Sequence, residues 1–337
     1  MLVSCGTTSS EVAPEIGNNS VEGVIAQASA RSTTIAPKTN TVYQGAFVGD
    51  VITESNVSSF EIMSGDKLDI ALKYLAFYDL ETGSGFPSSE AQIMVNRNGA
   101  IFIKLEPWSW GVAGLPTYSL DDISSGKYDY LLQKFAAGAR SFGKPIFVSF
   151  GHEMNGNWYP WAGNPTSYIN AYRHVYNAVK SYGANNVTWV WCPNIDSGNV
   201  NAYYPGGTYV NWVGAEGYNT TDYGMPWRSA SQLFSTLITQ LESYGKPIMI
   251  SEFGCDAKTS LDETVNKPQW ITGGFDYLLT KKIPKKTDNE IKAFVYFNID
   301  KVENGLGKEW AIDTTYSQSA YSQAVLKYKS MFLNNVN

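Results

Sequence analysis

The feature that most constrains the fold is an alternation of short apolar runs and amphipathic stretches between Tyr43 and Phe332. Amphipathic stretches with a helical period are Tyr128–Ser141, Tyr168–Ser181, Ala230–Ser243, Phe275–Lys282 and Tyr321–Phe332. Eight runs have the length and composition of strands: Tyr43–Val48, Tyr74–Tyr78, Ala100–Leu105, Pro145–Phe150, Asn186–Cys192, Trp212–Tyr218, Pro247–Ser251 and Ala293–Asn298. Because repeated strand-then-helix units build parallel sheets, we predict an α/β fold, a (β/α)8 TIM barrel, as one domain over residues 41–335.

The segment before the barrel has a different composition. Residues 1–42 contain no Phe, Trp or Tyr and are rich in Ser, Thr, Ala and Asn, so we predict a lipoprotein-like leader and flexible linker over residues 1–40. Leu2-Val-Ser-Cys5 resembles a bacterial lipobox, although only four residues precede Cys5 and coincidence is the alternative. We expect an extracytoplasmic protein, secreted or anchored at the bacterial cell surface, that meets a membrane only through a lipid on Cys5.

Charge and cysteine content narrow the possible partners. A net charge of −6 with a pI near 5.1 argues against nucleic acid and leaves a neutral substrate as the simpler expectation. The three cysteines show no CxxC spacing and there are two histidines, so we expect no metal and no cofactor. Cys192 and Cys255 either form a disulfide or remain free thiols. We expect a monomer.

Two glutamates stand at the ends of predicted strands. Glu153 follows the fourth strand and Glu252 follows the seventh, and a Gly-Lys-Pro sequence precedes both strands. In a barrel of this kind the active site is built at the carboxyl ends of the strands. Hydrolysis of a glycosidic bond needs two carboxyl groups that flank it. We therefore predict that Glu153 and Glu252 are a catalytic pair, with a structural or merely solvated glutamate as the alternative for each.

Side-chain alternation places further residues on the faces of the strands. Residues two apart on a strand point the same way, so Gly214, Glu216 and Tyr218 should share one face of the sixth strand. By the same rule Ile248, Ile250 and Glu252 should share one face of the seventh strand.

Aromatic and polar side chains collect near the same strand ends. Flat rings stack on the CH face of a sugar and polar groups select among its hydroxyls. The predicted substrate-binding residues are His152, Trp158, Trp108, Glu106, Asn194, Trp161 and Trp310. For the rings the alternative is packing over the barrel end, and for His152 it is a core histidine bonded to a backbone carbonyl. A barrel that binds β-glycan without cleaving it would need the rings but neither glutamate.

Two motifs carry a family resemblance. Phe150-Gly-His-Glu-Met-Asn-Gly-Asn-Trp-Tyr159 and Ile250-Ser-Glu-Phe-Gly254 resemble glycoside hydrolase family 26, a clan A group of retaining endo-β-glycanases on (β/α)8 barrels. The resemblance covers roughly residues 41–333. It implies that Glu153 is the acid/base, Glu252 the nucleophile and Tyr218 the residue that orients the nucleophile.

The substrate is predicted less directly. Mannanases of the family usually carry Arg-Pro just upstream of the His-Glu pair, whereas this chain has Ser149-Phe150-Gly151 there. We therefore expect an endo-acting enzyme on mixed-linkage β-1,3-1,4-glucan, with endo-β-1,4-mannanase or β-1,3-xylanase as alternatives. Retention implies carboxyl groups about 5–5.5 Å apart. Apolar rings should raise the pKa of Glu153 and Tyr218 should lower that of Glu252, with His152 neutral.

Overall fold

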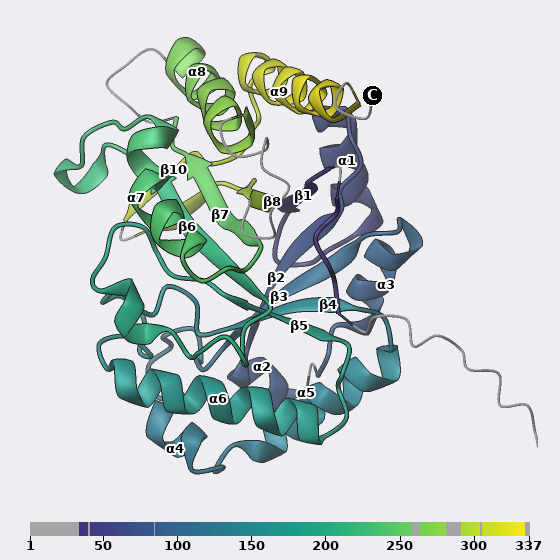
Figure 1. The fold of residues 1–337 in the computed structure, drawn as a ribbon, viewed down its shortest axis with the longest axis vertical. Helices are drawn as coiled ribbons and strands as arrows, with labels where there is room; N and C mark the ends of the chain where they lie inside the picture. The colour runs from purple at the N-terminus through teal and green to yellow at the C-terminus, as the bar shows by residue number, and fades with distance from the viewer. Residues whose placement is uncertain are drawn as a thin grey trace, which may run out of the picture. The chain divides into compact units, whose positions relative to one another are not determined.

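The computed structural model describes residues 34–333 except 40, 84, 258–262, 281–290 and 304. Eight parallel strands form a closed barrel in chain order, which confirms the predicted fold (Figure 1). They are β1 (Tyr43–Phe47), β2 (Ile70–Ala76), β3 (Ala100–Glu106), β4 (Ile146–Phe150), β5 (Val187–Trp191), β6 (Trp212–Asn219), β7 (Ile248–Cys255) and β8 (Ile291–Phe297). Parallel pairing of β1 with β8, from Tyr43 opposite Ala293 to Phe47 opposite Phe297, closes the ring.

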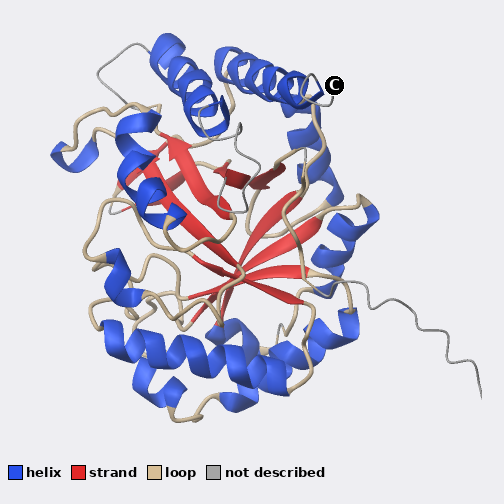
Figure 2. Cartoon of the chain, viewed as in Figure 1, coloured by secondary structure: helices blue, strands red, loops and turns tan. Residues whose placement is uncertain are grey.

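Helices surround the strands on the outside (Figure 2). They are α1 (Glu54–Ser64), α2 (Phe77–Thr82), α3 (Ser88–Asn96), α4 (Leu120–Ser124), α5 (Asp129–Phe142), α6 (Pro165–Ser181), α7 (Ala230–Glu242), α8 (Glu263–Phe275) and α9 (Thr315–Leu333). Shorter elements are the 3-10 turns η1 (Val200–Tyr203) and η2 (Asp222–Gly224), the π turn η3 (Asp276–Thr280), and a hairpin of β9 (Lys301–Glu303) with β10 (Leu306–Lys308). Within the described residues, every helix is too short or too polar to cross a membrane.

Local sequence explains where the main helices begin and end. The Asn164 side chain accepts a hydrogen bond from the Ser167 N–H, and Pro165 follows it at the first helical position of α6. Ser229 and Gln232 form a capping box at the start of α7. Gly143 ends α5 with a φ of 67°, a left-handed conformation that glycine adopts without a Cβ clash.

The hydrophobic core has two layers, as alternating strand residues require. Inward side chains such as Phe47, Phe102, Phe147 and Trp212 fill the barrel, and outward ones pack against the helices. Ile35, in the segment before β1, is hydrogen-bonded to residues of the barrel strands β5 and β6. Its N–H donates to Thr188 Oγ1 at 2.7 Å and its carbonyl accepts from Trp212 Nε1 at 3.0 Å. The chain is thus tied to the barrel upstream of residue 41, while Cys5 lies outside the described residues.

Some predicted helices and strands differ from those in the structure. Strand β2 ends at Ala76 rather than Tyr78, because the Asp79 carboxylate accepts from the Ala76 N–H and begins α2 there. Helices α1 to α3 were not predicted, since they bury few side chains and show little amphipathic pattern. The helix predicted over Phe275–Lys282 begins earlier than expected, because α8 starts at Glu263 and continues as the π-helical η3 up to Thr280, while the rest of the predicted range lies outside the described residues.

Candidate active site

A cavity of 710 Å³ opens at the carboxyl ends of the strands. Seven of the predicted site residues line it: Glu106, Trp108, Glu153, Trp158, Asn194, Tyr218 and Glu252. Five aromatic residues that the sequence analysis did not select also line it: Phe47, Tyr74, Trp110, Tyr159 and Phe297. A neighbouring cavity of 830 Å³ shares Asp50, Tyr74 and Trp110 with the first. The two together form a cleft that continues past the glutamates over the end of β2.

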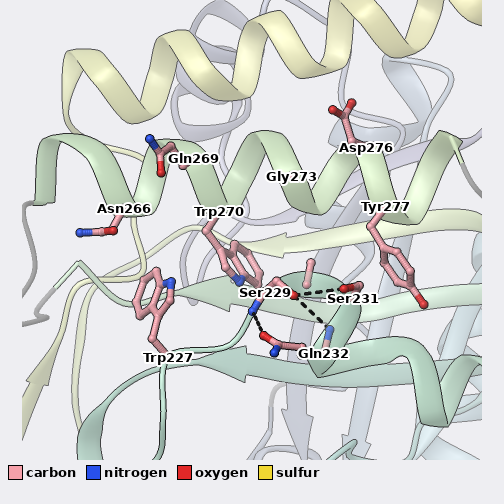
Figure 3. A pocket seen from close by; sticks show the side chains of 11 residues that line it. Trp227, Ser229, Ser231, Gln232, Asn266, Gln269, Trp270, Gly273, Asp276 and Tyr277 are labelled. Carbon is pink, nitrogen blue, oxygen red and sulfur yellow. Dashed lines mark hydrogen bonds between the residues drawn. The ribbon is translucent and has the colours of Figure 1, made fainter.

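A further cavity of 510 Å³ lies between α7 and α8, on the outside of the barrel. Figure 3 shows Asn266, Gln269 and Trp270 of α8 and Tyr277 of η3 across from the start of α7. Asp276 is the single carboxylate among the described residues that line it, and this side chain pairs with Lys327 at 2.7 Å. This cavity therefore lacks the carboxyl pair on which the predicted chemistry depends.

Glu153 sits just beyond β4 in a strained backbone conformation. Its φ is 51°, which a residue with a Cβ rarely adopts, and its N–H donates to the Cys192 carbonyl at 2.7 Å. Asn194 Nδ2 donates to Oε1 at 2.6 Å and Trp158 Nε1 donates to Oε2 at 2.7 Å. Asn155 holds the Asn194 backbone through its side-chain amide. The carboxyl group of Glu153 is thus fixed by two uncharged donors.

Glu252 on β7 has a different set of neighbours. Tyr218 donates its hydroxyl to Oε2 at 2.5 Å, and Tyr74 of β2 donates to Oε1 at 2.6 Å. The ammonium of Lys104 on β3 also contacts Oε1. The predicted hydrogen bond between Tyr218 and Glu252 is present in the structure, but Tyr74 and Lys104 were not anticipated.

A buried network of charges lies beneath the cleft. Lys104 Nζ is 2.6 Å from Glu216 Oε1, and Glu216 Oε2 is 2.7 Å from His152 Nδ1. His152 Nε2 is in turn 3.1 Å from Glu106 Oε1. Both nitrogens of the imidazole therefore face carboxylates, an arrangement that suits a ring with protons on both.

The two glutamates differ in acidity. Burial, followed by the charges of Glu216 and Glu252, raises the pKa of Glu153 to about 7, against weaker opposition from His152 and Asn194. Burial also acts to raise the pKa of Glu252, but Lys104 and His152 outweigh it and lower that pKa to about 2. Near neutral pH one carboxyl group holds a proton while the other is ionised.

His152 behaves differently from the expectation. Burial and Lys104 both act to lower its pKa, but Glu216 and Glu106 outweigh them and raise it to about 10. The prediction of a neutral ring is therefore wrong. The reason is that two carboxylates, neither visible as a neighbour in the sequence, flank the imidazole.

Three predicted substrate contacts do not line the cleft. His152 is buried beneath it. Trp161 is buried behind Tyr159, with ring centroids 4.3 Å apart, and its Nε1 donates to the His152 carbonyl at 2.7 Å. Trp310 is buried against the ring of Tyr218, with centroids 4.9 Å apart. The structure therefore places these three side chains behind residues of the cleft, whereas Trp158 is 47% exposed.

The alternation rule holds on one strand and fails on the next. On β6 the side chains of Glu216 and Tyr218 both face the barrel interior, as predicted. On β7 the pairing slips, since Ala215 is opposite Ile250 but Glu216 is opposite Glu252. This bulge leaves Ile250 packed outward and turns Glu252 inward.

A disulfide and a metal site are the two other kinds of chemistry that the cysteines, the histidines and the carboxylates could provide. Cys192 and Cys255 are free and buried, so they do not form a disulfide. His152, Glu153 and Glu216 offer atoms within 4.8 Å of one another, the spacing that a metal ion would require. Both imidazole nitrogens already face carboxylates, and Lys104 supplies positive charge beside Glu216. This donor set does not suit a divalent cation.

The fold and the site together define a class: (β/α)8 barrels that present paired carboxyl groups in a ring-lined cleft at the carboxyl ends of the strands. Residues 117–265 match the family described as "Glycosyl hydrolase family 26". The chain belongs to this family.

Individual relatives agree with this assignment. "Endoglucanase H" of Acetivibrio thermocellus is 32% identical over 296 residues, which cover 83% of this chain and 30% of that protein. A "Mannan endo-1,4-beta-mannosidase" of Bacillus subtilis (strain 168) is 27% identical over 172 residues, 47% of this chain and 41% of that protein. The chain thus spans less than half the length of these relatives.

Solved structures share the fold. The catalytic domain of a GH26 endo-beta-1,4-mannanase from Bacillus sp. JAMB-750 has a TM-score of 0.62 at 16% identity, covering 89% of this chain and 94% of that one. A GH26 beta-mannanase from Bacteroides ovatus has a TM-score of 0.61 at 16% identity, covering 87% and 90%.

Proposed function

We propose that the protein is a retaining endo-β-glycanase in which Glu153 is the acid/base and Glu252 the nucleophile. The observation that carries this proposal is the pair of carboxyl groups in one cleft with opposite partners: Glu153 has the uncharged donors of Asn194 and Trp158, whereas Glu252 contacts the ammonium of Lys104. In agreement with these surroundings, the pKa of Glu153 is raised to about 7 and that of Glu252 is lowered to about 2. Such a separation assigns proton donation to one group and attack to the other. The extension of the cleft past the pair and over the end of β2 supports endo action, since a glycan chain can lie along it.

Each group has a defined part in the reaction. An oxygen of the Glu252 carboxylate attacks the anomeric carbon while the bond to the glycosidic oxygen breaks, and Glu153 gives its proton to that oxygen. Glu153, now ionised, takes a proton from water, whose oxygen displaces Glu252 from the sugar. Two inversions retain the β-anomer. We propose that Tyr218 and Tyr74 orient Glu252, and that Trp158 and Asn194 orient Glu153.

The test of the enzyme is release of reducing ends together with the anomer formed first. Glu252→Gln should abolish release from a polysaccharide that the wild type cleaves, and proton NMR should show the β-anomer first. Initial α-anomer would refute the covalent step and point to carboxyl groups about 6.5–9.5 Å apart. If the wild type bound glycan but released no reducing ends, the alternative of a non-catalytic binding barrel would replace the proposal.

For the substrate, the comparisons favour mannan over the mixed-linkage glucan that we expected first. Four matching proteins bear the name mannan endo-1,4-beta-mannosidase, although each aligns with less of the chain than Endoglucanase H does. We therefore propose β-1,4-mannan as the first candidate. The 296-residue match to Endoglucanase H keeps a β-glucan, including the mixed-linkage type, as the second. Comparing kcat/KM on galactomannan, barley β-glucan and β-1,3-xylan decides among them.

We also propose that the enzyme acts outside the cytoplasm, as a monomer. A polysaccharide substrate and the lipobox-like sequence that ends at Cys5 support this location. Membrane fractions of a bacterial host should contain the wild type but lose it on Cys5→Ser. Light scattering of the purified protein should give the mass of one chain.

A further inference from the structure

Lys104 is a buried charge for which the proposed reaction has no step. It lies within β3 and is 0% exposed, and it does not line the cleft, so substrate does not reach it. An ammonium group taken out of water costs several kcal/mol unless good partners offset the loss. The partners here are Glu216 and Glu252, which the ammonium contacts together.

Those two glutamates are register partners on neighbouring strands. Glu216 of β6 lies opposite Glu252 of β7 in the parallel pairing that follows the bulge. Two carboxylates held this close in a buried site do not both ionise unless a cation is present, because like charges raise the pKa of one of them. Lys104 contacts one oxygen of each.

The surrounding charges make this cation hard to replace. His152 is the other cation of the cluster, and its Nδ1 is 4.0 Å from Glu252 Oε1 but 2.7 Å from Glu216. The imidazole is thus committed mainly to Glu216 and, through Nε2, to Glu106. The groups that face Glu252 or Lys104 from all neighbouring elements are Tyr74, Glu106, His152, Glu153, Cys192, Glu216 and Tyr218. Among these residues His152 is the one other cation, and its nearest nitrogen is 4.0 Å from Glu252 Oε1, so Lys104 makes the closer contact.

We propose that Lys104 is a positioning residue that bridges Glu216 and Glu252 and thereby keeps the nucleophile ionised. This proposal rests on the proposed function, since it concerns the same nucleophile. A lysine that served only to hold the fold together would affect stability but would not change the protonation of Glu252.

The test measures formation of the glycosyl-enzyme alone. A 2-deoxy-2-fluoro β-glycoside with a dinitrophenolate leaving group traps the nucleophile and needs no proton from Glu153, so the pH dependence of labelling follows Glu252 alone. In Lys104→Met the acid limb of this profile should rise by about 1–3 pH units, the usual effect of a charge at this range. Lys104→Arg, which keeps the charge, should return the limb toward its wild-type position.

A matched control separates this effect from loss of stability. Lys308 is 1% exposed and pairs with Asp222 and Asp256, away from the cleft lining. Lys308→Met should lower Tm as Lys104→Met does while leaving the acid limb in place. If Lys104→Met does not fold, Lys104→Met with Glu216→Gln removes one acid together with the cation, and its limb should still lie above that of Glu216→Gln alone.

The outcomes are distinguishable. An acid limb that stays in place in Lys104→Met, or in the double variant relative to Glu216→Gln, would overturn the role of Lys104 and leave the enzyme proposal intact. Failure of the wild type to be labelled on Glu252 at any pH would overturn the nucleophile assignment itself.

Discussion

Replacement of Glu153 by Gln should make the protein increasingly more stable than the wild type as pH rises. The pKa of this group is about 7 in the fold, against an ordinary value of 4.5. Each pH unit between the two pKa values is worth about 1.4 kcal/mol, so the raised pKa of Glu153 amounts to about 3 kcal/mol. Because the pKa is raised, this stability is fully present below about pH 4.5 and is lost as pH rises through about 7. Glutamine never ionises and does not incur the loss.

The assay is urea unfolding of wild type and Glu153→Gln at pH 5 and pH 8. Between pH 5 and pH 8, the difference in unfolding free energy between the two proteins should shift by about 2–3 kcal/mol in favour of the variant, the part of the total that falls within this pH range. The amide NH2 of the new Gln faces the N–H of either Asn194 or Trp158, so one donor there loses its acceptor at a cost of about 1–3 kcal/mol. This cost is the same at both pH values, so it cancels when the two measurements are compared.

Glu252→Gln is the control for this measurement. The pKa of Glu252 is lowered to about 2, so the stability it contributes is complete above its ordinary pKa and is lost only toward pH 2. Its replacement should change the unfolding free energy less between pH 5 and pH 8 than Glu153→Gln does, because it removes only the part of the raised Glu153 pKa that the Glu252 charge contributes. A pH-independent effect of Glu153→Gln would refute the idea that burial holds a proton on this group.

Three further replacements test individual contacts. Tyr218→Phe removes a hydrogen bond to Glu252, so kcat/KM should fall by about 10-fold or more and the acid limb should move to higher pH; an unchanged pH–rate profile would contradict this. Trp158→Phe keeps an aromatic ring but removes the N–H that stabilises ionised Glu153, so the basic limb of the pH–rate profile should move to higher pH. A shift of this limb to lower pH would count against a stabilising hydrogen bond from Trp158. Trp161→Phe removes the N–H that donates to the His152 carbonyl behind the cleft, so thermal unfolding should show a loss of about 1 kcal/mol in the free energy of unfolding. KM should stay nearly unchanged. A large rise in KM would instead indicate that Trp161 contacts the substrate.

The sequence predicted the barrel and the carboxyl pair because both depend on local patterns. An apolar run of five to eight residues that ends at Gly or at a polar cluster marks a strand and its carboxyl end. Glu153 and Glu252 follow directly, since parallel strands of one barrel bring their carboxyl ends to one rim. Neither step needs knowledge of which strand neighbours which.

Features set by neighbouring strands were not predictable in this way. The bulge on β7 arises from pairing with β6, and the strand's own sequence shows only an even alternation. Lys104 and Glu216 are 112 residues apart, and only closure of the barrel brings them together. A charged residue inside a largely apolar strand was nevertheless a usable sign of both Lys104 and Glu216, because buried charges are almost always paired.

Both glutamates are buried, so the proposed acid/base and the proposed nucleophile differ in acidity because of the kind of partner that each one has. Glu153 has two uncharged N–H donors, from Asn194 and Trp158, which orient the carboxyl group but do not offset the negative field around it. Glu252 has a direct ammonium contact from Lys104 and therefore ionises at a pH where Glu153 does not. Burial first, and then the charges of Glu216 and Glu252, raise the pKa of Glu153. Lys104 and His152 thus favour the ionised form of Glu252, and the charge fixed there adds to the effects that keep a proton on Glu153.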